Sequence, residues 1–290
     1  MNASLTVREK TIGWWQALNP AIYLISFLPG VAVALFAPAG SALWPLVWAT
    51  MGVVLIQHGI NLLNDAMDWS RGADVEKYNS WVRFHLRDPK RAERHGLVAL
   101  LSGVLLGVWV LYRQQSLFVL LLGLPLVLLG YGYNAGNKPF AYSAFSEWVT
   151  GACYGPGVFG CLWLLSRGPN GWVGVFGSVA FGALAVAVLL SHQPSQVLTD
   201  AMVGKKSFAV RFGVRKTVVT TQVLFSLSLL MLDAAYFSAG LAFAWVALFS
   251  SLFLYLFVRR AQSWRPMTLL LAATLKLALL TGLNLLGGVA

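Results

Sequence analysis

Long apolar runs, separated by short polar segments, recur along the whole chain. A helix that crosses a lipid bilayer needs about 20 predominantly apolar residues, and nine runs approach that length. These runs cover residues 20–37, 43–64, 95–113, 116–134, 144–165, 172–195, 217–236, 239–258 and 267–288. The pattern predicts an all-α, polytopic membrane bundle of about nine transmembrane helices. Because several connections are too short to hold a soluble domain, we expect a single membrane-embedded domain over residues 1–290.

The composition excludes an ordinary soluble protein, because 58% of the residues are hydrophobic and only 11% are charged. The net charge of +11 would suit nucleic acid, but the positions of the cations argue against that partner. With the N-terminus in the cytoplasm, nine spans place 18 Lys and Arg residues inside and only Arg113 and Arg167 outside. Cytoplasmic loops collect Lys and Arg. We therefore expect a lipid bilayer as partner, no nucleic acid, and a location in the inner (plasma) membrane of a bacterium.

The segment before the first run, residues 1–16, carries charged residues followed by Trp14 and Trp15. Tryptophan favours the interface between membrane and water. We expect this N-terminal segment to lie along the interface on the cytoplasmic side.

Acids and amides are concentrated where the second apolar run ends, at Asn61, Asn64, Asp65, Asp68 and Asp74. Carboxylate and carbonyl oxygens are the ligands that Mg²⁺ prefers, and ionisable groups at the end of a membrane helix are functional candidates by default. Asp65 and Asp68 are three residues apart, so they share one face of a helix. The segment is therefore a candidate metal site.

Two further polar segments are predicted at the same membrane face. The loop after the fourth run and the loop after the sixth run contribute Tyr133, Lys138, Tyr142, Gln193, Gln196, Asp200, Lys205 and Lys206. Acids that hold Mg²⁺, together with Lys or Arg that contact phosphate oxygens, suit a metal–diphosphate group. We expect a cytoplasm-facing polar cavity, with an apolar interior behind it that takes a hydrocarbon tail.

At these residues the chain resembles the UbiA superfamily of intramembrane prenyltransferases, and most closely the branch that prenylates dihydroxynaphthoate in menaquinone biosynthesis. The segment from Asn64 to Asp74 is similar to that branch's N-D-x-x-D-x5-D motif. The segment from Tyr133 to Glu147 is similar to its Tyr…Lys-Pro…Tyr…Glu pattern, and Asp200 to Gly213 to its D-x3-G-K-[RK]-[TS]-x-A-V-R-x-G stretch.

The resemblance implies Mg²⁺-dependent transfer of an isoprenyl group from an isoprenyl diphosphate to an aromatic or quinone-precursor acceptor. The catalytic residues that it implies are Asp65, Asp68, Lys138 and Asp200. The implied metal ligands are Asn64, Asp65, Asp68, Asp74 and Asp200. The implied substrate contacts are Gln57, Asn61, Arg83, Tyr133, Lys138, Tyr142, Gln193, Gln196, Lys205 and Lys206. We expect Glu147 to have a structural role, paired with a nearby Lys or Arg.

One departure from the family pattern concerns the second acidic motif, which usually reads D-x3-D. Here Gln196 stands at its first position, four residues before Asp200. A glutamine offers one neutral oxygen in place of an anion, so it would hold a divalent cation more weakly.

Two other functions remain open from the sequence. A terpene cyclase on the same scaffold would share the metal site and need no acceptor. A non-catalytic lipid-binding or transport protein would release no diphosphate from any donor. Alternative roles for single residues are a marker of the cytoplasmic side for Lys138 and a helix N-cap for Asp200.

Overall fold

The computed structural model describes residues 12–38, 41–73, 77–168, 170–260 and 264–287. Within these ranges the regular elements are all helical. The α-helices are α1 Trp14–Leu18, α2 Leu24–Phe36, α3 Leu43–Ser70, α4 Trp81–Phe84, α5 Pro89–Arg113, α6 Leu120–Asn134, α7 Ser146–Ala152, α8 Cys161–Leu165, α9 Gly171–His192, α10 Val197–Met202, α11 Phe208–Phe212, α12 Val214–Ser238, α13 Ala244–Arg260 and α14 Pro266–Gly287. Shorter helices are η1 Pro20–Tyr23, η2 Leu117–Val119, η3 Phe140–Tyr142, η4 Cys153–Gly160 and η5 Gln193–Ser195.

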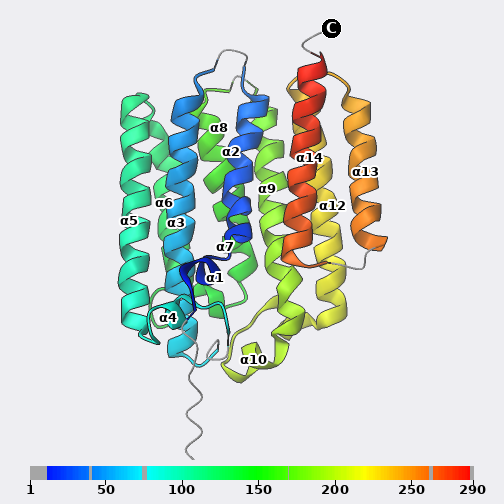
Figure 1. Cartoon of the computed structure of the whole chain (residues 1–290). Helices are drawn as coiled ribbons and strands as arrows, with labels where there is room; N and C mark the ends of the chain where they lie inside the picture. The colour runs from blue at the N-terminus through cyan, green and yellow to red at the C-terminus, as the bar shows by residue number, and fades with distance from the viewer. Residues whose placement is uncertain (1–11, 39–40, 74–76, 169, 261–263, 288–290) are drawn as a thin grey trace, which may run out of the picture.

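The long helices run side by side as one bundle (Figure 1). Eight helical stretches in the described part of the chain are long and apolar enough to cross a membrane. They are Trp14–Phe36, Leu43–Ser70, Pro89–Arg113, Leu117–Asn134, Ser146–Leu165, Gly171–Ser195, Val214–Ser238 and Pro266–Gly287. The remaining predicted run, residues 239–258, corresponds to α13, a helix of 17 residues that stands beside α12 and α14 in Figure 1. The predicted all-helical, multi-pass membrane fold is confirmed.

Among the predicted boundaries that differ from the observed helix ends, two concern the helices that carry or adjoin the acids. Helix α3 continues to Ser70, six residues beyond the predicted end, because the acids in its last turns are turned inward and have hydrogen-bond partners. Helix α5 begins at Pro89 instead of residue 95. Proline suits the first helical position, and the Asp88 side chain caps this terminus by accepting from the backbone N–H groups of Lys90 and Arg91.

Helices α3 and α5 pack closely against each other, with glycines facing each other. A Cβ on Gly59 would lie 2.6 Å from the carbonyl oxygen of Gly96, and a Cβ on Gly103 would lie 2.6 Å from that of Gly52. Small residues let the backbones of membrane helices approach in this way. The helices α3 and α5 are therefore closely packed and form one side of the bundle.

Helices α7 and α8 are joined by η4, a π-helical stretch that contains Pro156. Proline has no N–H for the α-helical ladder, and π-helical turns occur mostly inside α-helices at functional sites. At Gly155 this stretch packs closely on α9, since a Cβ there would lie 2.5 Å from the Ser178 carbonyl oxygen. Residues of α7, η4 and α8 line the cavity described below.

The interfacial N-terminal segment predicted over residues 1–16 lies mostly outside the described residues. Its described part includes α1, where the rings of Trp14 and Trp15 stack 5.4 Å apart and are largely exposed. Helices α1, α4 and α10 lie at the same end of the bundle (Figure 1). We call this the acidic end, because Asp65, Asp68 and Asp200 lie there on α3 and α10. Its location on the cytoplasmic side stays a prediction.

Candidate active site

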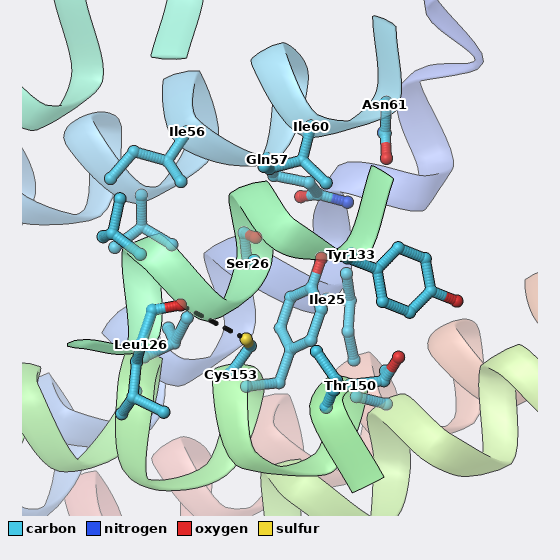
Figure 2. A pocket seen from close by; sticks show the side chains of 18 of the residues that line it. Ile25, Ser26, Ile56, Gln57, Ile60, Asn61, Leu126, Tyr133, Thr150 and Cys153 are labelled. Carbon is cyan, nitrogen blue, oxygen red and sulfur yellow. Dashed lines mark hydrogen bonds between the residues drawn. The ribbon is translucent and has the colours of Figure 1, made fainter. Parts of the chain in front are cut away.

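A cavity of about 440 Å³ opens from the acidic end into the bundle. Its polar end is lined by Asn61, Asn64, Gln196, Asp200 and Lys205, and most other lining residues are apolar or small. Figure 2 shows Gln57, Ile60 and Asn61 of α3 along one wall, with other side chains from α2, α6, α7 and η4 around the same space. The cavity therefore joins an acidic, amide-rich end to an apolar interior, as the sequence predicted.

Asp68 is 2% exposed and is held on both oxygens. Its Oδ1 accepts a hydrogen bond of 2.8 Å from the Tyr142 hydroxyl. Its Oδ2 accepts from Asn64 Nδ2 at 3.1 Å and lies 3.2 Å from the ammonium of Lys205. The structure thus brings four predicted site residues from three separate segments into one cluster.

Asp65 is 5% exposed and faces the loop that follows α3. The Lys77 ammonium lies 2.7 Å from Oδ1, and the Trp81 backbone N–H donates to Oδ2 at 2.8 Å. The Trp81 ring packs edge-to-face on His58 and His95, which fixes α4 against α3 and α5. The loop contact on Asp65 is therefore supported by buried aromatic packing.

His85 also contacts His95, one of the two histidines against which the Trp81 ring packs. His85 Nε2 is 3.1 Å from His95 Nδ1. Burial, with a smaller effect of the nearby His95 and Arg91, lowers the pKa of His85. A hydrogen bond between these two ring nitrogens requires that one of them is unprotonated and accepts.

Glu147 fixes the position of the segment that carries Gln196, Asp200 and Lys205. We call its contacts with the residues that follow this segment the Glu147 clamp. The carboxylate of Glu147 accepts from the Phe208 N–H at 2.9 Å and pairs with Arg211 at 2.8 Å. Gln193 extends the clamp, since its Oε1 accepts from the Ala209 N–H at 3.1 Å. The structural role predicted for Glu147 fits this geometry, and the Gln193 side chain lines the cavity while serving the same clamp.

Gln57 and Tyr133 line the cavity deeper than the acids. Gln57 is 6% exposed, and its Nε2 donates to the Ile22 carbonyl at 3.1 Å. Its Oε1 is buried and has no hydrogen-bond partner among the described residues. Figure 2 places Gln57, Asn61 and Tyr133 around the same space. This part of the cavity offers polar groups that can orient a ring bearing hydroxyl groups.

The residues close to the two α3 carboxylates fit a magnesium ion. Among the described residues no group of three or more His, Cys, Asp or Glu side chains gathers as a metal cluster. Magnesium is commonly held by one or two carboxylates, several waters and the phosphates of a substrate, so it requires no such cluster. Asn64 and Asp200 line the polar end of the cavity, and Asp65 and Asp68 lie on the same helix as Asn64. These four side chains supply oxygens of the right chemistry. Asp74 lies outside the described residues.

Comparisons with known proteins identify the family. The model of the UbiA prenyltransferase family matches residues 23–281. The chain belongs to this family. The chain is 29% identical over 236 residues to a 1,4-dihydroxy-2-naphthoate octaprenyltransferase of Mycobacterium tuberculosis, covering 76% of this chain and 80% of the relative. It is 27% identical over 220 residues to a 2-carboxy-1,4-naphthoquinone phytyltransferase of Synechocystis, covering 73% and 68%.

A solved structure shares the fold. It is a UbiA homolog from Archaeoglobus fulgidus bound to GPP and Mg²⁺, with a TM-score of 0.66, 13% identity, and coverage of 94% of this chain and 98% of that one. At this identity the likeness concerns the fold.

Several residues implied by the UbiA resemblance are not among the residues that line the cavity. Asp65, Asp68 and Tyr142 are buried beside it, and Asp68 is joined to the lining through Asn64 and Lys205. Lys138 is exposed on the loop after α6, Arg83 is half-buried on α4, and Lys206 is exposed beside the loop. Lys206 contributes its backbone N–H to the Tyr142 carbonyl at 3.2 Å. Of these two neighbouring lysines, Lys205 is therefore the one that reaches Asp68 in this UbiA-family site.

Two cations at the site were missed as site residues by sequence reasoning. Lys77 pairs with Asp65. The Arg71 guanidinium lies 4.5 Å from the centre of the Tyr142 ring and donates to the Asn137 carbonyl at 3.1 Å. Both cations follow the α3 acids closely in the sequence, and other cations do so too. Spacing alone therefore does not show which of them contact the site.

Proposed function

We propose that this protein transfers an isoprenyl group from an isoprenyl diphosphate to an aromatic, quinone-precursor acceptor inside the membrane, with Mg²⁺ as cofactor. The observation that carries the proposal is the direct continuity between an acid, amide and lysine cluster and a deep apolar cavity. The names of the relatives, which are naphthoate and naphthoquinone prenyltransferases, support an aromatic acceptor of that class.

The acidic end is proposed to bind the diphosphate. Asp65 and Asp68, with Asn64 and Asp200, would hold Mg²⁺, which when bound neutralises charge on the leaving diphosphate. Lys205 and Lys77 already lie within 3.2 Å and 2.7 Å of the two carboxylates. Ammonium groups at this position can contact the phosphate oxygens that the metal leaves free.

The apolar part of the cavity is proposed to take the isoprenyl tail and to keep water from the allylic carbon when its bond to the diphosphate breaks. The walls near the polar end include Tyr133 and Tyr154 among apolar residues. Aromatic faces stabilise a nearby cation, and an excluded volume prevents its capture by water.

The acceptor is proposed to lie between Gln57 and the allylic carbon. The buried Gln57 Oε1, which has no hydrogen-bond partner among the described residues, can accept from a hydroxyl group on the acceptor ring. This contact would fix which ring carbon faces the donor. A naphthalene-type acceptor with ring hydroxyls would contact the apolar walls with its ring and donate a hydrogen bond to Gln57 Oε1.

The test uses purified protein in lipid nanodiscs, an isoprenyl diphosphate, and 1,4-dihydroxy-2-naphthoate, each added with and without Mg²⁺. Mass analysis of extracted lipids should find a prenylated naphthalene product only when donor, acceptor and Mg²⁺ are present. A hydrocarbon formed without acceptor would support the terpene cyclase instead. Absence of diphosphate release from donors of every length would favour a non-catalytic binding protein.

A further inference from the structure

The cavity extends much farther from the acidic end than a diphosphate and an aromatic ring require. Along α3 its lining runs from Asn64 to Ala49, a distance of about 22 Å at roughly 1.5 Å per helical residue. At the far end it is lined by Leu111, Val119 and Leu165. If the donor binds as proposed above, this length is available to its tail.

Helix α5 contributes one face to the far half of the cavity, through Gly103, Val104, Gly107, Val108 and Leu111. The spacing of three and four residues is that of one helix face. Two glycines on this face have different surroundings. A Cβ on Gly103 would lie 2.6 Å from the Gly52 carbonyl oxygen, so helix packing requires glycine there.

Gly107 has no such packing reason. A Cβ at this position would meet no atom within 4 Å, although Gly107 is one of the cavity-lining residues. The missing side chain of Gly107 therefore leaves open volume at the cavity wall, into which the Cβ of a larger residue would project.

The depth of Gly107 can be placed from its partner on α3. A Cβ on Gly52 would lie 3.5 Å from the Gly107 nitrogen, so the two residues are at the same level. Gly52 is separated from Asn64 by about 18 Å along the helix. One extended isoprene unit, with four carbon–carbon bonds of about 1.5 Å each, advances about 5 Å. Gly107 consequently lies beside the third to fourth isoprene unit of a bound tail.

We propose that Gly107 determines the donor chain length, by keeping the far half of the cavity open to tails of four or more isoprene units. A bulky residue at this level would close the cavity behind the third unit. Donors with short tails would still reach the acidic end, because their last carbon lies before this level.

The experiment measures kcat/KM for geranyl, farnesyl, geranylgeranyl and octaprenyl diphosphate, with Gly107→Ala, Gly107→Leu and Gly107→Phe beside the wild type. The matched control is Gly282→Phe on α14, where a Cβ also meets nothing within 4 Å and which does not line the cavity. We expect Gly107→Phe to keep geranyl transfer within about twofold and to lose at least about tenfold with geranylgeranyl and longer donors, as overpacking of a filled site requires. Gly107→Leu should lie between, and Gly282→Phe should match the wild type.

Two results would overturn the assignment. One is a donor profile for folded Gly107→Phe and Gly107→Leu that equals that of Gly282→Phe. The other is an equal loss with all four donors, which would place Gly107 next to the reacting atoms or in the packing. Should Gly107→Phe fail to elute as a folded species, Gly107→Leu decides between these results. Failure of the proposed function is seen separately, as a wild type that turns over no donor.

Discussion

The hydroxyl of Tyr142 donates a hydrogen bond of 2.8 Å to Oδ1 of Asp68, across 74 positions of the sequence. Both side chains are buried, and the bond ties the segment after α6 to the end of α3. It leaves Oδ2 of Asp68 directed at Asn64 and Lys205. Tyr142 therefore positions one of the two proposed metal-binding carboxylates.

Tyr142→Phe should weaken the site without unfolding it, because the ring over which Arg71 and Lys205 lie is kept. A hydrogen bond to a charged group contributes about 1.5–3 kcal/mol, so kcat/KM should fall by roughly tenfold to a hundredfold. The Mg²⁺ concentration for half-maximal activity should rise in parallel. The control is Tyr131→Phe, an exposed tyrosine on α6. Equal activity of the two variants would show that Tyr142 does not position Asp68.

Gln196→Asp should tighten the dependence on Mg²⁺. Gln196 lines the polar end of the cavity with Asp200, and the substitution adds an anionic oxygen where the family pattern has one. The metal concentration for half-maximal activity should fall severalfold, as expected for one more carboxylate ligand. The matched control is Gln115→Asp, at the opposite end of the bundle. An unchanged metal titration would show that the side chain at position 196 does not reach the metal.

A buried ion pair joins the last three long helices. Lys276 of α14 is 0% exposed and pairs with Asp233 of α12, while its ammonium also donates to the Ala247 carbonyl of α13 at 2.6 Å. Removal of one partner from a buried pair costs about 3–5 kcal/mol. Lys276→Met should therefore lower the thermal midpoint in detergent markedly, and Asp233→Asn combined with Lys276→Met should recover part of the loss. Equal midpoints for all three proteins would mean that the pair contributes nothing to stability.

The sequence predicts the fold well because hydropathy acts locally, and the length of each apolar run reports a helix directly. The shared face of Asp65 and Asp68 was also predictable, since it depends only on a spacing of three residues. The contacts that complete the site were not. Tyr142 and Lys205 reach Asp68 from 74 and 137 positions away, and tertiary packing alone decides which of several Tyr and Lys residues arrive.

Two other features left no local signal. Lys138 and Lys205 have the same charge and both follow membrane helices, yet only Lys205 lines the cavity. The rule that places cations in cytoplasmic loops applies equally to both. The open volume at Gly107 is likewise invisible in a sequence with 28 glycines, because the neighbours of a glycine distinguish a packing role from a cavity role.

The orientation of the bundle is testable without any assay of activity. Single cysteines introduced at residues 88 and 204, near the acidic end, should react with a membrane-impermeant reagent only after the cells are opened. A cysteine at residue 115, at the opposite end, should react in intact cells. These results follow from 18 basic residues on the proposed cytoplasmic side against two outside. Labelling of residue 88 in intact cells would invert the proposed topology.

The most direct test of the central claim is the Mg²⁺-dependent formation of prenylated naphthalene product by wild type, Asp65→Asn and Asp68→Asn in nanodiscs. Asparagine keeps the shape of each side chain and removes its charge, and Glu93→Gln on the exposed face of α5 is the matched control. We expect product from the wild type and from Glu93→Gln, and a loss of at least about a hundredfold in each aspartate variant, as the removal of charge stabilisation in catalysis requires. Near wild-type turnover in either folded aspartate variant would contradict the account.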